Sequence, residues 1–111
     1  MRTRGAHAQH MHTIRLGPPW QLNAVDGGTR HARKFGAPRT LDADERVWLV
    51  CAHVPGATTV TVNGETVASL DAPGPVAVDV TCLMRPRNEV TFAVASDAAL
   101  GAVALEIRAA V

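Results

Sequence analysis

Hydrophobic and polar residues alternate with a period of two in short runs along most of this chain of 111 residues. A period of two puts successive side chains on opposite faces of an extended segment, so each run predicts a β-strand with at least one apolar face. Trp20 and Leu22 form a short alternating pair of this kind. The other runs lie at residues 12–16, 31–35, 47–52, 59–62, 66–68, 76–80, 90–94 and 103–107.

Residues with turn-forming chemistry separate these runs. Asn63-Gly64 lies between two β-rich runs and predicts a tight hairpin, because both central residues of a type I′ turn need a positive φ. The alanine-rich segment 98–111 also admits a helical interpretation, since alanine is a strong helix former. Val103, Leu105 and Ile107 keep the period of two there, and we therefore expect a strand.

The run at 47–52 is apolar on both faces. Val47, Leu49 and Cys51 alternate with Trp48, Val50 and Ala52. This pattern is typical of a central strand covered on both sides. With about eight short strands and no long helix, the chain as a whole predicts an all-β sandwich or barrel.

Length and composition limit the number of domains and the classes of partner. A chain of this length predicts one domain, and we expect residues 1–10 to be a disordered leader before a single β-sandwich domain at 11–111. Hydrophobic residues make up 47% and charged residues 19%, which excludes wholesale disorder. The formal net charge of +1 argues against a nucleic-acid partner, and no apolar run approaches the ~20 residues that would cross a membrane.

The chain start and the two cysteines bear on location. The charged N-terminus is not followed by the apolar segment of a signal peptide, and two cysteines are too few for a disulfide framework. We therefore expect a cytoplasmic protein, or a piece cut from a larger one. Cys51 and Cys82 both lie among apolar residues and are expected to be buried thiols, with a disulfide between them left open.

Several short motifs follow one another in order from Trp20 to Val94. After Trp20 come Arg33-Lys34-Phe35, Val47-Trp48-Leu49-Val50-Cys51, Val60-Thr61-Val62-Asn63-Gly64, Val78-Asp79-Val80-Thr81 and Pro86-Arg87-Asn88-Glu89-Val90-Thr91-Phe92. This order resembles the N-terminal jelly-roll "sugar-binding" domain of family 2 glycoside hydrolases, and more broadly the galactose-binding-domain-like folds. The resemblance implies a jelly-roll β-sandwich, standalone and truncated.

The chain departs from the family pattern at several positions. His31-Ala32 stand where the family usually has Tyr-Arg, Cys51 replaces a phenylalanine, and Arg87 replaces a glycine. In those hydrolases the catalytic carboxylates belong to a separate barrel domain, so the resemblance supplies no catalytic residue here. A jelly roll of that family often serves only as a scaffold.

The polar clusters of the chain do not indicate catalysis, a metal or a cofactor. Asp42, Asp44 and Glu45 are expected to keep a connection solvated, since no calcium-loop motif accompanies them. The histidines at positions 7, 10 and 12 lie in or next to the leader, and a flexible leader does not fix their rings, so we expect no native metal site there. No activated serine or cysteine stands out.

Sugar binding needs an exposed aromatic ring with polar neighbours. Trp48 is the best platform if its face of the strand is open, with Arg33 or His31 as neighbours. If a second layer covers that face, Trp48 belongs to the core, which the usual burial of large aromatics favours. Phe35 and Phe92 fall on apolar stripes, and Trp20 is expected near the sandwich edge.

The sequence therefore supports two hypotheses of function. The first is a non-catalytic module that binds carbohydrate. The second is a protein-interaction or assembly module without sugar affinity, and a small sandwich of this kind can form a homodimer through an edge strand. A hydrolase ranks well below both, because no acid/base pair can be named.

Overall fold

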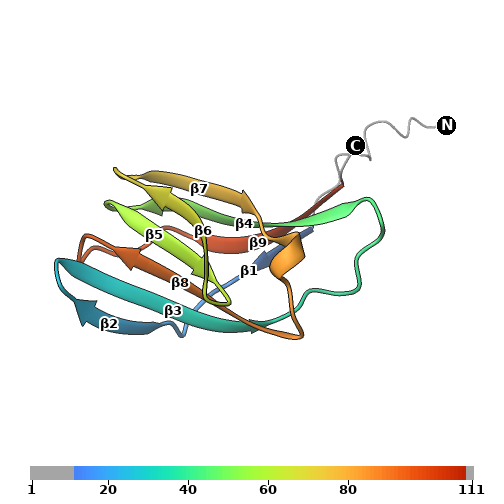
Figure 1. Ribbon diagram of the computed structural model, residues 1–111, viewed down its shortest axis with the longest axis horizontal. Helices are drawn as coiled ribbons and strands as arrows, with labels where there is room; N and C mark the ends of the chain where they lie inside the picture. The colour runs from blue at the N-terminus through green and yellow to red at the C-terminus, as the bar shows by residue number, and fades with distance from the viewer. Residues whose placement is uncertain (1–11, 110–111) are drawn as a thin grey trace.

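Nine strands and one short 3-10 turn follow one another in the part of the chain that the structure describes, residues 12–109 of a computed structural model (Figure 1). The predicted leader at 1–10, with His7 and His10, lies outside these residues. The elements are β1 (His12–Arg15), β2 (Gln21–Val25), β3 (Gly28–Gly36), β4 (Glu45–Val54), β5 (Thr58–Val62), β6 (Glu65–Leu70), β7 (Gly74–Asp79), η2 (Thr81–Leu83), β8 (Arg87–Val94) and β9 (Val103–Ala109).

The strands agree closely with the alternating runs. Eight strands correspond to the eight other runs, and the ninth, β2, contains Leu22 and begins directly after Trp20. The alanine-rich C-terminal segment holds β9 rather than a helix, as the valine, leucine and isoleucine spacing predicts. The β5–β6 turn has φ values of 52° at Asn63 and 86° at Gly64, which confirms the predicted hairpin.

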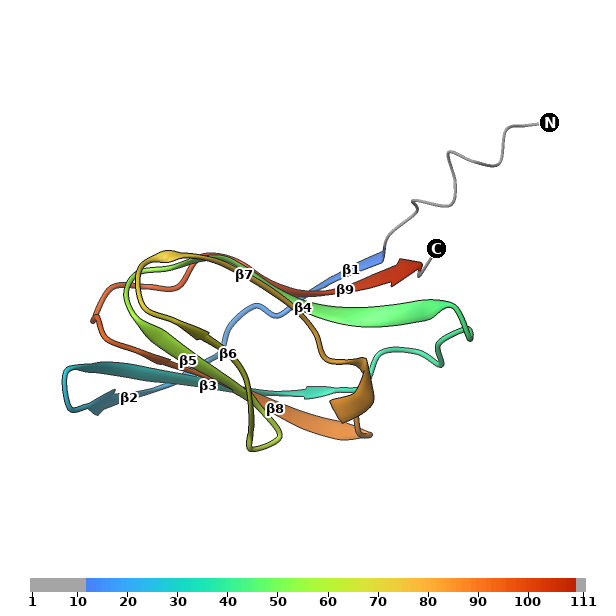
Figure 2. The ribbon, with the colours of Figure 1, turned by 45° about the horizontal axis from the view of Figure 1, so that its top comes forward.

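Two antiparallel sheets stack face to face, as Figure 2 shows. The four-stranded sheet has the order β1-β9-β4-β7, and the five-stranded sheet has the order β2-β3-β8-β5-β6. The predicted all-β sandwich of jelly-roll type is confirmed. Residues 12–109 include no helix that is long and apolar enough to span a membrane.

The core lies between the two sheets and is built from alternate residues of the strands. Alternate side chains of β8, of β9 and of β4 up to Cys51 point inward, and a register shift between Cys51 and Val54 brings Val54 inward as well. Burial of apolar surface there stabilises the fold by roughly 25 cal/mol per Å². The largest fully buried side chains are those of Phe92, Leu49, Leu105, Ile107, Val47, Val54, Val60, Val62, Val80, Val90 and Val94.

The prediction that β4 is covered on both faces is wrong. β4 is central in its sheet, between β9 and β7, but only its inner face meets the other sheet. Trp48 and Val50 lie half-buried on the outer face, and Ala52 is exposed there. Apolar residues on both sides of the strand reflect a surface that is partly apolar, not a second covering layer.

The two cysteines differ in environment. Cys51 is buried in the core, and desolvation raises the pKa of its thiol. Cys82 is exposed in the η2 turn, so the prediction of two buried thiols is wrong for this residue. Both are free, and the disulfide that the sequence left open is not formed.

Candidate functional site

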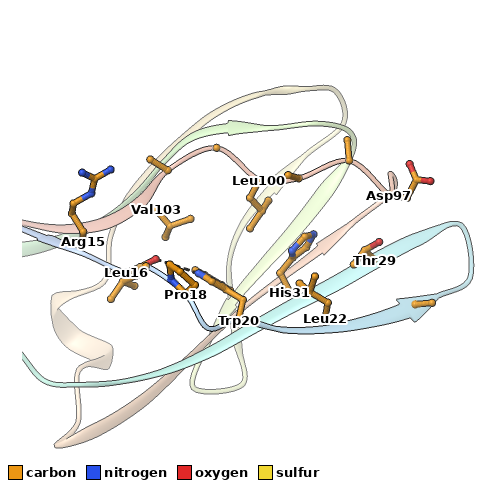
Figure 3. Close-up of a pocket in the computed structure, with 16 residues that line it drawn as sticks. Arg15, Leu16, Pro18, Trp20, Leu22, Thr29, His31, Asp97, Leu100 and Val103 are labelled. Atoms are coloured by element: carbon orange, nitrogen blue, oxygen red, sulfur yellow. Dashed lines mark hydrogen bonds between the residues drawn. The ribbon is translucent and has the colours of Figure 1, made fainter.

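A cavity of about 690 Å³ opens between the two sheets beside β2 (Figure 3). It forms because β1 pairs with only part of β9, from Arg15 opposite Ala104 to His12 opposite Ile107. Beyond Leu16 the chain leaves the four-stranded sheet through Gly17-Pro18-Pro19. The β8–β9 connection at 95–102 therefore faces β2 and β3 across an open space with no strand between them.

The cavity walls are mainly apolar. Leu16 and Trp20 come from the β1–β2 segment, Leu22 from β2, and Leu100 and Val103 from the opposite side. The Trp20 ring is held in place, since its Nε1 donates to the Leu16 carbonyl at 3.2 Å. It also packs edge-on against core residue Phe92, with ring centroids 6.0 Å apart, so Trp20 forms a rigid wall.

His31 supplies the one deeply placed polar group of the cavity. It lies on the inner face of β3 and is only 6% exposed. In Figure 3 its ring rises from β3 toward Leu100. Within residues 12–109, His31 Nε2 is the only buried side-chain nitrogen or oxygen atom without a hydrogen-bond partner.

The burial of His31 has two chemical consequences. Desolvation lowers the pKa of its imidazole, so the ring is neutral at pH 7 and its nitrogens can accept or donate a hydrogen bond. A buried polar atom without a partner costs about 1–3 kcal/mol. A ligand that brings a hydrogen-bonding group to Nε2 would remove this cost.

Three other polar side chains line the cavity. Thr29 lies two residues before His31 on the same face of β3, and Asp97 lies on the β8–β9 connection. Arg15 lies at the end of the cavity away from Asp97 in Figure 3. The arrangement therefore has an apolar interior, one buried imidazole, and polar groups of both charges around it.

The structure does not bring the three predicted sugar-binding residues together. His31 and Arg33 lie on the inner side of β3, whereas Trp48 lies on the outer face of the other sheet. Trp48 thus has neither residue as a neighbour, and the expectation that it would is wrong. The expectation that Trp48 belongs to the core is also wrong, since its side chain is half-buried on an open face.

The actual surroundings of Trp48 and Arg33 are local. The guanidinium carbon of Arg108 lies 4.4 Å from the centroid of the Trp48 ring, and Arg108 pairs with Glu106 at 2.7 Å. Arg33 donates through Nε to the Gly17 carbonyl at 2.6 Å and so ties β3 to the β1–β2 segment. Arg33 contacts the segment that carries the cavity wall and does not itself line the cavity.

Sequence reasoning missed most of the cavity. Trp20 was expected near the sandwich edge, but nothing in its sequence neighbourhood pairs it with Leu100 or Asp97. These residues line the same cavity only because the β8–β9 connection faces β2 across it. His31 is the predicted candidate that does lie in the cavity.

Glu45, the last residue of the acidic cluster at 42–45 and the first residue of β4, has a structural role. Glu45 pairs with both terminal nitrogens of Arg39, at 2.9 and 3.0 Å, and accepts the Asp42 N–H at 2.9 Å. The hydrogen bond from Arg39, followed by that from Asp42, lowers the pKa of Glu45 to about 2. No cluster of three or more metal-ligating side chains occurs at positions 12–109.

Comparison with known proteins shows which solved structures have a similar fold. No protein-family model matches the sequence, and no curated protein matches it significantly. Among solved structures, an FMN-binding β-glucuronidase from Faecalibacterium prausnitzii L2-6 matches 89% of the chain with a TM-score of 0.72 and 21% identity. A Bifidobacterium dentium β-glucuronidase complexed with coumarin-3-O-glucuronide matches 76% with a TM-score of 0.67 and 18% identity.

A third match is a β-glucuronidase from an uncultured Clostridium species, which covers 73% of the chain with a TM-score of 0.59 and 21% identity. The chain spans only 23%, 20% and 19% of the lengths of these three proteins. The resemblance to a glycoside hydrolase domain is thereby confirmed for the fold, over a small part of each of those enzymes.

Proposed function

We propose that this protein is a non-catalytic carbohydrate-binding module and that the sugar occupies the cavity beside β2. The observation that carries this proposal is the Nε2 atom of His31, which is buried in a cavity wall and has no partner. A ligand hydroxyl is the group that best fits a neutral imidazole nitrogen, because a hydroxyl can either donate or accept.

Size and wall chemistry support a sugar. A cavity of about 690 Å³ is within the usual range for small-molecule sites, roughly 300–1,000 Å³. A sugar ring has apolar C–H faces that suit Trp20 and Leu100, and hydroxyls that suit His31, Thr29 and Asp97. Apolar walls with a few convergent polar groups are typical of such sites.

The composition of the cavity also supports a non-catalytic role. Glycoside hydrolysis generally uses two carboxyl groups on either side of the scissile bond. Among the residues that line the cavity, Asp97 is the only one with a carboxylate. The chain is similar to glycosidases over only about a fifth of their length, which supports a non-catalytic module.

The two tryptophans allow a direct test. In a Trp48→Phe variant, Trp20 is the remaining tryptophan, so its fluorescence reports on the cavity. We expect saturable changes in Trp20 emission with some members of a panel of monosaccharides, disaccharides and phenyl glycosides, with free phenol as the control for the apolar group. Calorimetry on the wild-type protein should give the same affinities.

Two variants locate the binding. His31→Phe removes the buried nitrogen and should weaken binding on the order of tenfold or more. Trp48→Ala should leave the affinity unchanged, because Trp48 lies on the outer face of the other sheet. Binding that disappears in Trp48→Ala but survives His31→Phe would move the site to that face, and no binding by any saccharide would overturn the proposal.

A protein-interaction module is the second candidate. The observation that favours it is the exposure of Leu22 at 62% and Val25 at 43%, both on β2. Large apolar side chains left exposed on an edge strand are typical of strands that bind another protein chain.

A further inference from the structure

β2 is an unprotected sheet edge. It pairs with β3 on one side, and its other side has no strand among the described residues. All five of its residues are exposed, and Leu22 and Val25 are the exposed large hydrophobic residues of the described chain. The strand reads Gln-Leu-Asn-Ala-Val and has neither a charge nor a proline.

The other three edges carry the features that usually discourage pairing between strands. β1 has four residues and ends at Arg15, β6 begins at Glu65, and β7 contains Pro75 and ends at Asp79. Charges, prolines and short length are the common means of protecting an edge. β2 is therefore the edge at which another strand can be added without a charge or a proline in the way.

The register of β2 fixes which of its backbone groups are free. Val25 and Gly28 are partners on either side of a two-residue turn, so they exchange backbone hydrogen bonds. Hydrogen-bonded pairs alternate along an antiparallel ladder, so Asn23 and Gln21 also direct their N–H and C=O groups toward β3. The backbone groups of Leu22 and Ala24 therefore point away from the sheet.

We propose that β2 pairs with β2 of a second copy of this chain, antiparallel and centred on Asn23. In this register Leu22 of one copy lies opposite Ala24 of the other, and their free N–H and C=O groups form backbone hydrogen bonds in both directions. The two five-stranded sheets become one continuous sheet.

Self-pairing fits the side chains of β2 as well as its backbone. On the inner face, the exposed Leu22 packs against Ala24 of the second copy and loses its contact with water. On the outer face, Val25 lies opposite Gln21, and Asn23 lies opposite its own counterpart. Because the strand is uncharged, the two-fold arrangement places no like charges opposite one another. The chain itself is thus the occupant that the edge suits best.

A cysteine at the centre tests the register. The two copies of Asn23 form a non-hydrogen-bonded pair, in which Cα atoms are about 4.5 Å apart, within the roughly 4.4–6.8 Å range of disulfides. Asn23→Cys in a Cys82→Ser background should therefore form a disulfide-linked dimer rapidly under mild oxidation. Ser69→Cys in the same background is the control, since Ser69 is also exposed and lies on the β6 edge.

Sedimentation of the chain without added cysteines tests the dimer independently. We expect reversible dimerisation that grows with concentration and that Leu22→Lys weakens on the order of tenfold or more, because it sets two ammonium groups close together. Ser69→Lys adds the same charge to another edge and should have no effect. A monomer at all concentrations up to the millimolar range, or equal cross-linking at both cysteine positions, would overturn the proposal.

Discussion

At the scale of single residues, Asn63 shows how one side chain serves two purposes. Its positive φ builds the β5–β6 turn, as the sequence predicts. Its Nδ2 also donates to the Leu83 carbonyl and to Oδ1 of Asn88, each at 2.9 Å, and its Oδ1 accepts the Glu89 N–H at 2.9 Å. The hairpin is therefore fastened to the start of β8 by a side chain that the sequence assigns only to the turn.

Replacing Asn63 separates these two roles. Asn63→Gly keeps the positive φ but loses the side-chain hydrogen bonds, and should lower the free energy of unfolding by about 2–3 kcal/mol. Asn63→Asp keeps the acceptor for Glu89 but sets a carboxylate oxygen against the Leu83 carbonyl and Asn88 Oδ1, which are both acceptors, and should cost at least as much. Urea unfolding measures the stability of both variants. An Asn63→Gly variant as stable as the wild type would mean that Asn63 contributes through its backbone alone.

At the scale of elements, the approach between β3 and β8 depends on one glycine. Gly28 begins β3 directly after the turn that follows β2, and β3 pairs with β8 from Thr29 opposite Val94 onward. A Cβ atom at Gly28 would overlap the Val94 carbonyl oxygen, so only glycine lets the two strands meet here. The same strand then carries His31 into the cavity.

Two glycine substitutions test this close approach. Gly28→Ala forces the β3 and β8 backbones apart and should cost about 1–3 kcal/mol, because crowding a packed site is destabilising. Gly74→Ala in β7 is the matched control, since a Cβ there meets nothing within 4 Å. Thermal or urea unfolding should show a large loss for the first variant and little change for the second. Equal effects would contradict the role of contact with Val94.

At the scale of the whole molecule, the cavity results from two sheets of unequal width. The five-stranded sheet extends to β2, while the four-stranded sheet ends at β1, which leaves the inner side of β2 facing the β8–β9 connection. The buried neutral His31 lies in this space, so protonation of one side chain bears on the stability of the entire fold.

The stability of the protein should accordingly depend on pH through His31. Burial lowers the pKa of His31 in the folded state, so the unfolded chain binds the proton more readily. The free energy of unfolding should fall as the pH drops below about 6.5. The fall should end once the pH is below the lowered pKa of His31 in the folded state. Urea unfolding across this interval should show a weaker pH dependence in His31→Phe. Glu45 does not affect stability in this pH interval. Its contribution to stability is lost only between its ordinary pKa of 4.5 and its folded-state pKa of about 2.

The sequence by itself determined the strands, the Asn63-Gly64 turn and the apolar stripes of the core, because a period of two and a positive φ are local properties of the chain. It also placed His31 among the candidate residues. Only the tertiary structure decided that the face of Trp48 is open and that Leu100 and Asp97 lie across from β2. Which strands pair, and in which register, depends on residues far apart in the sequence, so alternation within a strand cannot say what its two faces will meet.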